Sequence, residues 1–395
     1  MAEAHLKPGR EKAALNRHPW IFGGAIDRIE GQVEDGDIVT VRDAQGGFVG
    51  RGYLNRRSQI AVRLLTWDES ELIDSPFWAR RIVAAVGHRR SLAAYPATTA
   101  YRLIHAEADL LPGLTVDRYN DYLVVQCLTL GIARRQQEIL AALLQATSPA
   151  GIYERSDVDV REREGLPPAT GVWWGAEPPP EIEILENGHR FLVDLKTGQK
   201  TGFYLDQRAN RQALARYAAG KEMLDAFAYS GAFSVYAAAA GAGPIESLDG
   251  SADALALARR NLALNGLARP SDTCVQGDVF QVLRQYRDRR RAFDLIVLDP
   301  PRFAPTRQHV PHAARAYKDI NLLAIKLLRP GGTLFTFSCS GGVDAALFQK
   351  MVFGASIDAR RDVQILESLA QGPDHPVLLS FPESAYLKGL VCRVL

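Results

Sequence analysis

From Lys221 onward, short apolar runs typical of strands alternate with longer stretches of helical periodicity, and this alternation constrains the fold more than any other feature. The strand-like runs are 223–228, 245–249, 273–276, 294–298 and 333–338, and the helical stretches are 231–240, 252–265, 280–287 and 313–328. Such alternation is typical of a doubly wound, mostly parallel α/β sheet. Ligands of these sheets bind at the carboxyl ends of the strands, so the residues after each strand are the candidate site.

Three of these strands end in an acidic residue: Asp225, Asp249 and Asp278. The turn after the first strand holds one glycine, Gly231, whereas a loop that cradles a pyrophosphate needs several. Asp249 lies at the spacing at which an acid accepts ribose hydroxyls, and Asp278 could meet an adenine amino group. Any one of these acids could instead be a helix N-cap. Three acids at the ends of three successive strands together indicate S-adenosylmethionine rather than NAD as the ligand.

The fourth strand leads into Asp299-Pro300-Pro301-Arg302-Phe303. The two prolines fix the backbone and remove two N–H donors, which holds the Asp299 carboxylate on a rigid rim. Phe303 could stack on a planar base. The fifth strand ends at Ser338, so Cys339 is expected at the same edge as Asp299, where a thiol with a lowered pKa can act as a nucleophile.

The other three cysteines, Cys127, Cys274 and Cys392, lie in apolar strand-like contexts and are predicted to be buried and inert. No Cys-x-x-Cys pair is present, which excludes a zinc ribbon, and no metal site is predicted. The polar N-terminal residues and the lack of a long apolar run lead us to expect a cytoplasmic protein without a membrane partner.

Two further regions precede the alternating part. Residues 1–72 read as a small barrel-like β module with strands near 38–41, 48–50 and 59–65. Residues 73–182 read as a second α/β unit, with a helix over 75–95, two strands around Asn120-Asp121 and a helix over 134–147. The last domain, 183–395, opens with a hairpin at Asn187-Gly188, whose residues suit a type I′ turn.

The net charge of +2 gives no broad field for a polyanion, so any nucleic-acid surface must be local. Of the 47 basic residues, 38 are arginines, a bias that a GC-rich genome explains without any function. In the first module, Arg51, Arg56, Arg57 and Arg63 could form one face. His18-Pro19-Trp20 is predicted to be a packed corner rather than an RNA contact.

Residues 190–395 resemble the class I S-adenosylmethionine-dependent methyltransferases, and the whole chain is similar to the bacterial 23S ribosomal RNA cytosine-C5 methyltransferases with an N-terminal PUA domain. Besides the strand-end motifs above, the resemblance rests on segments 9–12, 18–22, 107–109, 111–114, 116–119, 154–157 and 199–208. It implies a PUA domain over residues 1–72, a Rossmann-like catalytic domain, 23S rRNA as substrate and a homodimer.

The resemblance also implies roles for individual residues. Cys339 would add to C6 of a flipped-out cytosine, so that C5 can accept the methyl group, while Asp299 would line the cleft and bond the base at N3 or N4. The residues that it places around the cofactor are Tyr204, Gln207, Arg208, Asp225, Tyr229, Gly231, Asp249, Asp278 and Asp299.

The chain departs from the two-cysteine RNA cytosine methyltransferases, because Pro300-Pro301 stands where those enzymes have a second cysteine. The base that removes the C5 proton is therefore left open. An enzyme that methylates an exocyclic amino group is an alternative, although Arg302 separates the Asp-Pro-Pro motif from its aromatic residue. A non-catalytic RNA-binding assembly factor is the other alternative.

Overall fold

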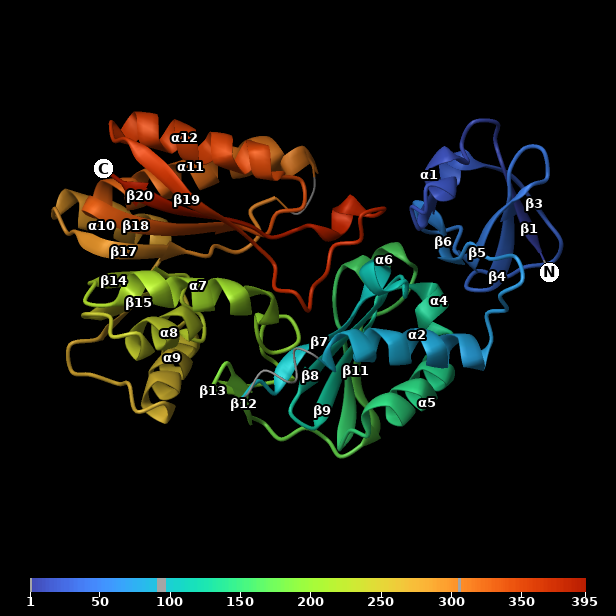
Figure 1. Cartoon of the computed structure of the whole chain (residues 1–395), viewed down its shortest axis with the longest axis horizontal. Coiled ribbons are helices and arrows are strands. Elements are labelled where there is room, and N and C mark those ends of the chain that lie inside the picture. The colour runs from blue at the N-terminus through green and yellow to red at the C-terminus, as the bar shows by residue number, and fades with distance from the viewer. Residues whose placement is uncertain (1, 91–96, 305–306) are drawn as a thin grey trace. The chain divides into compact units, whose positions relative to one another are not determined.

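A computed structural model describes residues 2–90, 97–304 and 307–395 of the chain (Figure 1). These residues form two compact units. One comprises Met1–Asn187, Val193–Leu205 and Asp374–Ser384, and the other comprises Gly188–Leu192, Asp206–Pro373 and Ala385–Leu395. The domain boundaries expected after residues 72 and 182 do not coincide with this division and stay a prediction.

The N-terminal part of the first unit is a six-stranded sheet in the order β2-β6-β5-β4-β1-β3, in which only β1 and β4 pair in parallel. Its strands are β1 (Glu3–Leu6), β2 (Trp20–Phe22), β3 (Ile26–Glu30), β4 (Ile38–Arg42), β5 (Phe48–Leu54) and β6 (Ile60–Thr66), with the short helix α1 (Lys12–Leu15). The three strands predicted between residues 38 and 65 are confirmed. Inward-facing apolar side chains of these strands form one buried cluster.

The remainder of the first unit is built on a five-stranded sheet in the order β11-β10-β9-β8-β7. The strands are β7 (Ala100–His105), β8 (Leu114–Tyr119), β9 (Tyr122–Cys127), β10 (Gly151–Ser156) and β11 (Ala169–Gly175), and the helices are α2 (Ser75–His88), α4 (Leu130–Ala133), α5 (Gln136–Thr147) and α6 (Val160–Arg163). The predicted turn at Asn120-Asp121 joins β8 to β9. The end of the helix predicted over 75–95 lies outside the described residues.

The hairpin at Asn187-Gly188 is confirmed. It joins β12 (Ile182–Glu186) to β13 (His189–Val193). Both turn residues have positive φ, 50° at Asn187 and 87° at Gly188, as a type I′ turn requires.

The second unit contains a seven-stranded sheet in the order β16-β15-β14-β17-β18-β20-β19. Its strands are β14 (Met223–Ala226), β15 (Ile245–Asp249), β16 (Thr273–Gln276), β17 (Phe293–Leu298), β18 (Leu328–Ser338), β19 (Val363–Ala370) and β20 (Lys388–Val394). The first five are parallel, and β20 is antiparallel to both of its neighbours. The predicted doubly wound sheet is confirmed.

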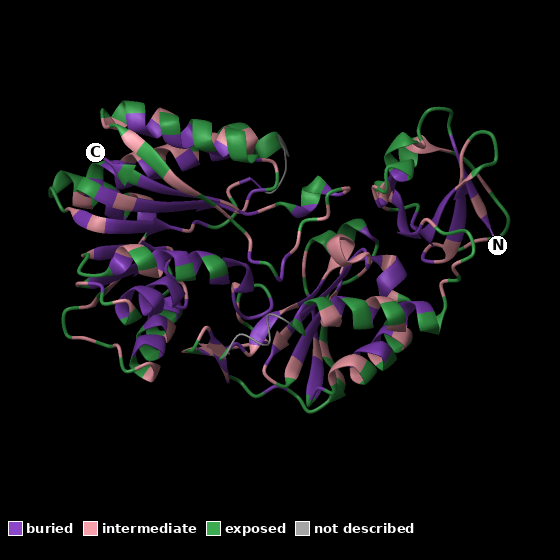
Figure 2. Ribbon diagram, in the orientation of Figure 1, coloured by how far each residue is buried: buried purple, intermediate pink, exposed green. Residues whose placement is uncertain are grey.

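Six helices accompany this sheet: α7 (Arg208–Ala218), α8 (Ala232–Ala239), α9 (Ala252–Leu264), α10 (Val279–Asp288), α11 (Val310–Leu327) and α12 (Ala345–Ala359). Helices α7 and α12 are not among the elements that the sequence predicts. Purple, buried stretches run along the central strands in Figure 2, whereas α11 and α12 carry green positions on their outer sides.

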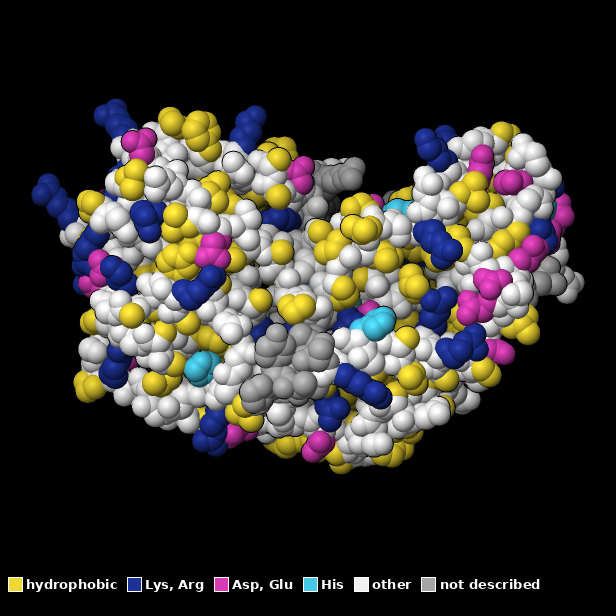
Figure 3. All heavy atoms as spheres, viewed as in Figure 1, with side chains coloured by type: hydrophobic (Ala, Val, Ile, Leu, Met, Phe, Trp, Pro, Cys, Tyr) yellow, Lys and Arg dark blue, Asp and Glu magenta, His cyan; other side chains and the backbone are white. Residues whose placement is uncertain are grey.

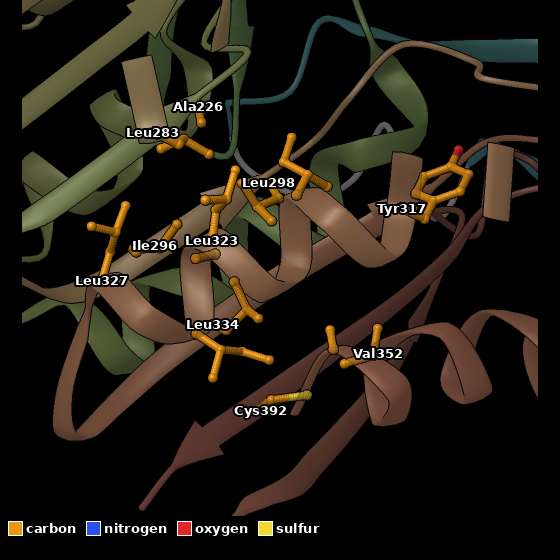
Figure 4. Packing of buried hydrophobic residues seen from close by; sticks show 14 of the residues in the cluster. Ala226, Leu283, Ile296, Leu298, Tyr317, Leu323, Leu327, Leu334, Val352 and Cys392 are labelled. Carbon is orange, nitrogen blue, oxygen red and sulfur yellow. The ribbon is translucent and has the colours of Figure 1, made fainter. Parts of the chain in front are cut away.

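One buried apolar cluster holds the second unit together (Figure 4). Ile296 and Leu298 of β17, Leu323 of α11 and Leu334 of β18 are at most 1% exposed. Burying such a side chain stabilises the fold by roughly 1.5–3 kcal/mol relative to leaving it in water. The cluster fixes β17 and β18 beside each other, and these are the strands that carry Asp299 and Cys339 at their ends.

The connection from β19 to β20 includes a segment, Asp374–Ser384, that belongs to the first unit. There the Asp374 carboxylate accepts a hydrogen bond from the backbone N–H of Arg102 at 3.0 Å. Phe381 packs edge-on against Trp20, with 4.6 Å between ring centroids. The Trp20 indole N–H donates to Glu107 at 2.9 Å, which supports the packed corner predicted for this tryptophan.

Candidate active site

The strand order reverses between β14 and β17, since β14 pairs with β15 on one side and with β17 on the other. A doubly wound sheet opens a crevice at such a point, beyond the carboxyl ends of its strands. Asp225 lies near the end of β14 and Asp249 is the last residue of β15, while Asp299 and Cys339 directly follow β17 and β18. The structure thus brings these predicted residues to one edge of one sheet.

Asp225 is the most buried acid at this edge, with 1% of its surface exposed. One carboxylate oxygen, Oδ2, accepts hydrogen bonds from the Ser234 hydroxyl at 2.7 Å and the Ser234 backbone N–H at 3.2 Å. Burial raises the pKa of Asp225 to about 7, and the carboxylates of Asp299 and Asp249 push it in the same direction. A cationic ligand would relieve this accumulation of acidic groups.

The turn after β14 has an unusual backbone. Phe227, Tyr229 and Gly231 all have positive φ, at 64°, 46° and 68°. A Cβ atom at Gly231 would lie 2.6 Å from the Cβ of Ala258 in α9, so the glycine permits close packing of α9 as well as the turn. Strained non-glycine residues of this kind often cluster at ligand sites.

Asp249 ties two turns together. Its Oδ2 atom accepts the backbone N–H of Tyr229 at 2.9 Å and its Oδ1 atom accepts that of Ser251 at 2.9 Å. Each carboxylate oxygen can accept two hydrogen bonds, so these contacts leave room for ribose hydroxyls. Asp278 is exposed and caps α10 by accepting the backbone N–H of Gln281 at 2.9 Å. The N-cap alternative is therefore correct for Asp278, whose adenine contact stays a prediction.

The loop after β17 lies against the end of β18. The Cys339 Sγ atom is 4.0 Å from the carbonyl oxygen of Pro300, and Cys339 is half-buried. The backbone N–H of Ala304 donates to the Ser340 hydroxyl oxygen at 3.1 Å, and the Tyr317 hydroxyl lies 3.0 Å from the same atom. The expectation that Cys339 stands beside the Asp-Pro-Pro loop is confirmed in its geometry.

Phe303 packs inside this loop. Its ring centroid lies 4.8 Å from that of Tyr317 and 5.9 Å from that of Phe280. The half-buried ring thus packs against side chains of the protein near Cys339. Its stacking on a base stays a prediction.

Two of the other cysteines are buried as predicted. Burial raises the pKa of the Cys127 thiol well above its ordinary value and that of Cys392 to about 12. The prediction is wrong for Cys274, which is half-buried because β16 is an edge strand of its sheet.

The three residues predicted to flank the cofactor before β14 fall in different places. Tyr204 belongs to the first unit, where its hydroxyl donates to Gln199 at 2.5 Å. Gln207 and Arg208 belong to the second unit and are buried, and Gln207 accepts a hydrogen bond from Asn210 at 2.5 Å. Their contacts with a cofactor stay predictions.

Sequence reasoning missed Lys388, the first residue of β20. Its Nζ atom donates to the carbonyl oxygens of Ser340 and Tyr386, both at 2.7 Å. No local motif marks this lysine, because its place beside Cys339 depends on the pairing of β20 with β18.

The first unit holds a cavity of about 740 Å³ between its two sheets, lined in part by Trp20, Arg57, Arg63 and Arg163. Arg63 is buried and bonded to Glu164 at 2.8 Å. The prediction that Arg51, Arg56, Arg57 and Arg63 form one exposed face is therefore wrong. Arg51 and Arg63 are buried, because both satisfy interior acceptors.

Lys and Arg side chains on the visible face are interspersed with acidic and apolar ones (Figure 3). Among the residues that the structure describes, no helix has the length and apolar character needed to cross a bilayer. The near-neutral charge of the chain is thus matched by a mixed surface on this face.

The sheet order and the acids at the switch point are those of a class I methyltransferase fold, with the half-buried Cys339 thiol at the same edge of the sheet. A family model described as S-adenosylmethionine-dependent methyltransferase matches residues 102–393, and one described as PUA-like domain matches residues 4–67. The chain belongs to the S-adenosylmethionine-dependent methyltransferases and carries a PUA-like N-terminal domain.

Curated relatives and solved structures match the chain over its full length. Proteins named ribosomal RNA large subunit methyltransferase I are 49% identical over 389 residues in Shewanella amazonensis, covering 98% of each chain, and 48% identical over 394 residues in Aeromonas hydrophila, covering 99% of each. The crystal structure of SMU.776 complexed with SAH superposes with a TM-score of 0.87 at 25% identity over 100% of both chains.

The residues present fit S-adenosylmethionine. The partly hydrogen-bonded acids Asp225 and Asp249 suit a ligand that carries an ammonium, a sulfonium and ribose hydroxyls. The turn at Gly231 lacks the repeated glycines of a pyrophosphate loop.

Proposed function

We propose that the chain methylates C5 of a cytosine in the RNA of the large ribosomal subunit, through a covalent bond between Cys339 and the base. The position of the Cys339 thiol carries this proposal: Sγ lies 4.0 Å from Pro300 O, beside the loop that follows Asp299. The names of the full-length relatives and the PUA-like domain support an RNA substrate from the large subunit.

The chemistry begins at the thiolate of Cys339, which adds to C6 of the cytosine. Addition makes C5 nucleophilic. Bound S-adenosylmethionine supplies an electrophilic methyl group. Loss of the C5 proton and departure of Cys339 from C6 then restore the aromatic ring. The reaction requires the cytosine to leave its stack, as enzymes that modify a base atom generally demand.

In this proposal Asp299 holds the base. It follows β17 directly, and its backbone N–H points to the carbonyl oxygen of Ala226 at 3.5 Å, which ties its loop to the end of β14. A carboxyl group at this point can bond N3 or the N4 amino group of cytosine and so stabilise charge that develops during addition. The Pro300-Pro301 step keeps the loop rigid.

Transfer to an exocyclic amino group is the rival chemistry for an Asp-Pro-Pro loop. That reaction uses an aromatic side chain to stack on the base and needs no thiol. Here Phe303 packs against Tyr317 and Phe280, while Cys339 stands half-buried at the loop. Both observations favour attack through the thiol over amino transfer.

The test is replacement of Cys339 by alanine. We expect methyl transfer to large-subunit RNA from a strain that lacks the enzyme to fall below detection, with S-adenosylmethionine affinity unchanged. Cys274→Ala, another half-buried cysteine, is the matched control and should retain activity. Mass spectrometry of the nucleosides should show 5-methylcytidine. Full activity of Cys339→Ala, or an N-methylated product, would refute the proposal.

A further inference from the structure

The thiol of Cys339 sits on a backbone that is held from three sides. Ser340, the next residue, accepts hydrogen bonds at its hydroxyl from Ala304 N–H and lies 3.0 Å from the Tyr317 hydroxyl. Its carbonyl oxygen accepts a third bond, from Lys388 Nζ at 2.7 Å. A buried or half-buried lysine costs desolvation energy unless it is paired, so its presence here calls for a partner charge.

The strand pairing brings Lys388 to this point. Strands β18 and β20 are antiparallel, and Ser338, the last residue of β18, lies directly opposite Lys388, the first residue of β20. Cys339 follows Ser338. The Lys388 ammonium has three N–H donors, and the carbonyls of Ser340 and Tyr386 account for two of them. Both contacts hold the ammonium over the turn that carries the thiol.

The charged groups that act on Lys388 come from three loops. Cys339 follows β18, Asp344 caps α12 and Arg302 follows β17. Burial lowers the pKa of Lys388 to about 8; Cys339 and Asp344 act against that shift, and Arg302 acts with it. Tyr317 of α11 faces the same turn, and burial raises the pKa of its hydroxyl, so it stays neutral.

We propose that Lys388 is the residue that activates Cys339, with its ammonium holding the cysteine as a thiolate. This inference rests on the proposed function, in which Cys339 is the nucleophile. The S–H bond breaks, its proton passes to solvent, and the electron pair stays on sulfur opposite the Lys388 ammonium for addition to C6. When Cys339 leaves the methylated base, the same pair returns to sulfur opposite the Lys388 ammonium. A cation beside a thiol favours the thiolate.

Alkylation of Cys339 by iodoacetamide across pH 5.5–10 tests the proposal, with peptide mass spectrometry as readout and Cys274 as internal reference. We expect Lys388→Met to raise the midpoint of the Cys339 profile by about one pH unit or more and to slow alkylation at pH 7 about tenfold. Lys388→Arg, which keeps the charge, should stay within about threefold of the parent protein. Lys318→Met, which removes an ion pair with Asp358 on α12, should leave the profile unchanged.

An unchanged Cys339 profile in folded Lys388→Met would overturn the proposal. If that variant does not fold, the alkylation profile of the parent protein is the test. A midpoint for Cys339 at or above the value of about 8.5 for a free cysteine would contradict a stabilised thiolate. In turnover, Lys388→Met should lower kcat without raising KM for RNA. The alkylation assay contains no RNA, so it tests the activation of Cys339 by Lys388 independently of the proposed substrate. Failure of the activation and failure of the substrate assignment can therefore be distinguished.

Discussion

The two halves of the catalytic sheet differ in how their site residues are held. In the half formed by β14, β15 and β16, Asp249 bonds Ser251 and Asp278 bonds Gln281, both close in sequence, and Asp249 also bonds Tyr229 in the turn after the adjacent strand. In the half formed by β17, β18 and β20, contacts join distant residues, as from Lys388 to Ser340 and from Cys339 to Pro300. The first half is a set of strand-to-helix turns, and the second is assembled by strand pairing.

The difference suggests that the first half binds the cofactor and the second half carries out the reaction at the thiol. The acids of the first half are held within the turns after β14, β15 and β16, without any contact from β18 or β20 among those described. The thiol side requires that three strands meet in one register, because Pro300, Cys339 and Lys388 come from separate elements. Substitutions in the two halves should therefore affect different kinetic constants.

Asp299→Asn should give the largest effect. Loss of one oriented charged group in the reacting half is expected to lower kcat by about 10²–10³-fold, as for a group that stabilises developing charge. Steady-state kinetics with RNA and a separate cofactor titration check this. Asp358→Asn, on the exposed side of α12, should behave as the parent. Equal loss of cofactor affinity would place Asp299 with the binding half instead.

Gly231→Ala should destabilise the fold by about 2–3 kcal/mol, because alanine would take a φ of 68° and meet Ala258 at 2.6 Å. Urea unfolding measures the loss. The control is Gly250→Ala, whose Cβ would have no atom within 4 Å. A cost below about 0.5 kcal/mol would mean that α9 can move away from the turn.

Asp249→Asn should weaken S-adenosylmethionine binding about tenfold, which corresponds to about 1.4 kcal/mol. The amide keeps the side-chain shape but donates where Asp249 now accepts the N–H of Tyr229 or Ser251. Calorimetric titration checks the affinity, and kcat at saturating cofactor should change little. Asp253→Asn, an exposed acid in the first turn of α9, is the control. A kcat loss at saturation would erase the distinction between the two halves.

The smallest effect is a pH dependence. Asp225 has a pKa of about 7, so below that pH it is protonated and must lose a proton when a cationic ligand binds. Affinity for S-adenosylmethionine should therefore rise with pH between 6 and 8, by at most tenfold for each pH unit below the pKa. Asp225→Asn should flatten the profile. If the affinity of the unmodified protein for S-adenosylmethionine fell with rising pH, this role of Asp225 would be contradicted.

Local patterns account for most of the fold. Strands β15 and β16 begin and end where the apolar runs predict, and the Asn187-Gly188 turn follows from its residue types. Asp225, Asp249 and Asp299 were found because parallel strands bring their ends to one edge. Helix α12 was missed, since its sequence carries a weak apolar stripe and its position depends on packing against α11.

Arginines of the first module show the limit of such patterns. Arg57 is exposed and Arg63 is buried against Glu164, although both stand in one short stretch rich in arginine. Glu164 directly follows α6 in another part of the same unit, far from Arg63 along the chain. The clustering of arginines in the sequence therefore did not predict which of them lie on the surface.

By itself the sequence determined the alternation of strands and helices from β14 to β18, the acids at the ends of these strands and the thiol after the fifth parallel strand, because hydrophobic periodicity and turn chemistry act over a few residues. The tertiary structure alone decided that β20 inserts antiparallel beside β18. Backbone hydrogen bonds between strands carry no local signature, so the meeting of Lys388 with the Cys339 turn could not be read before the strands were paired.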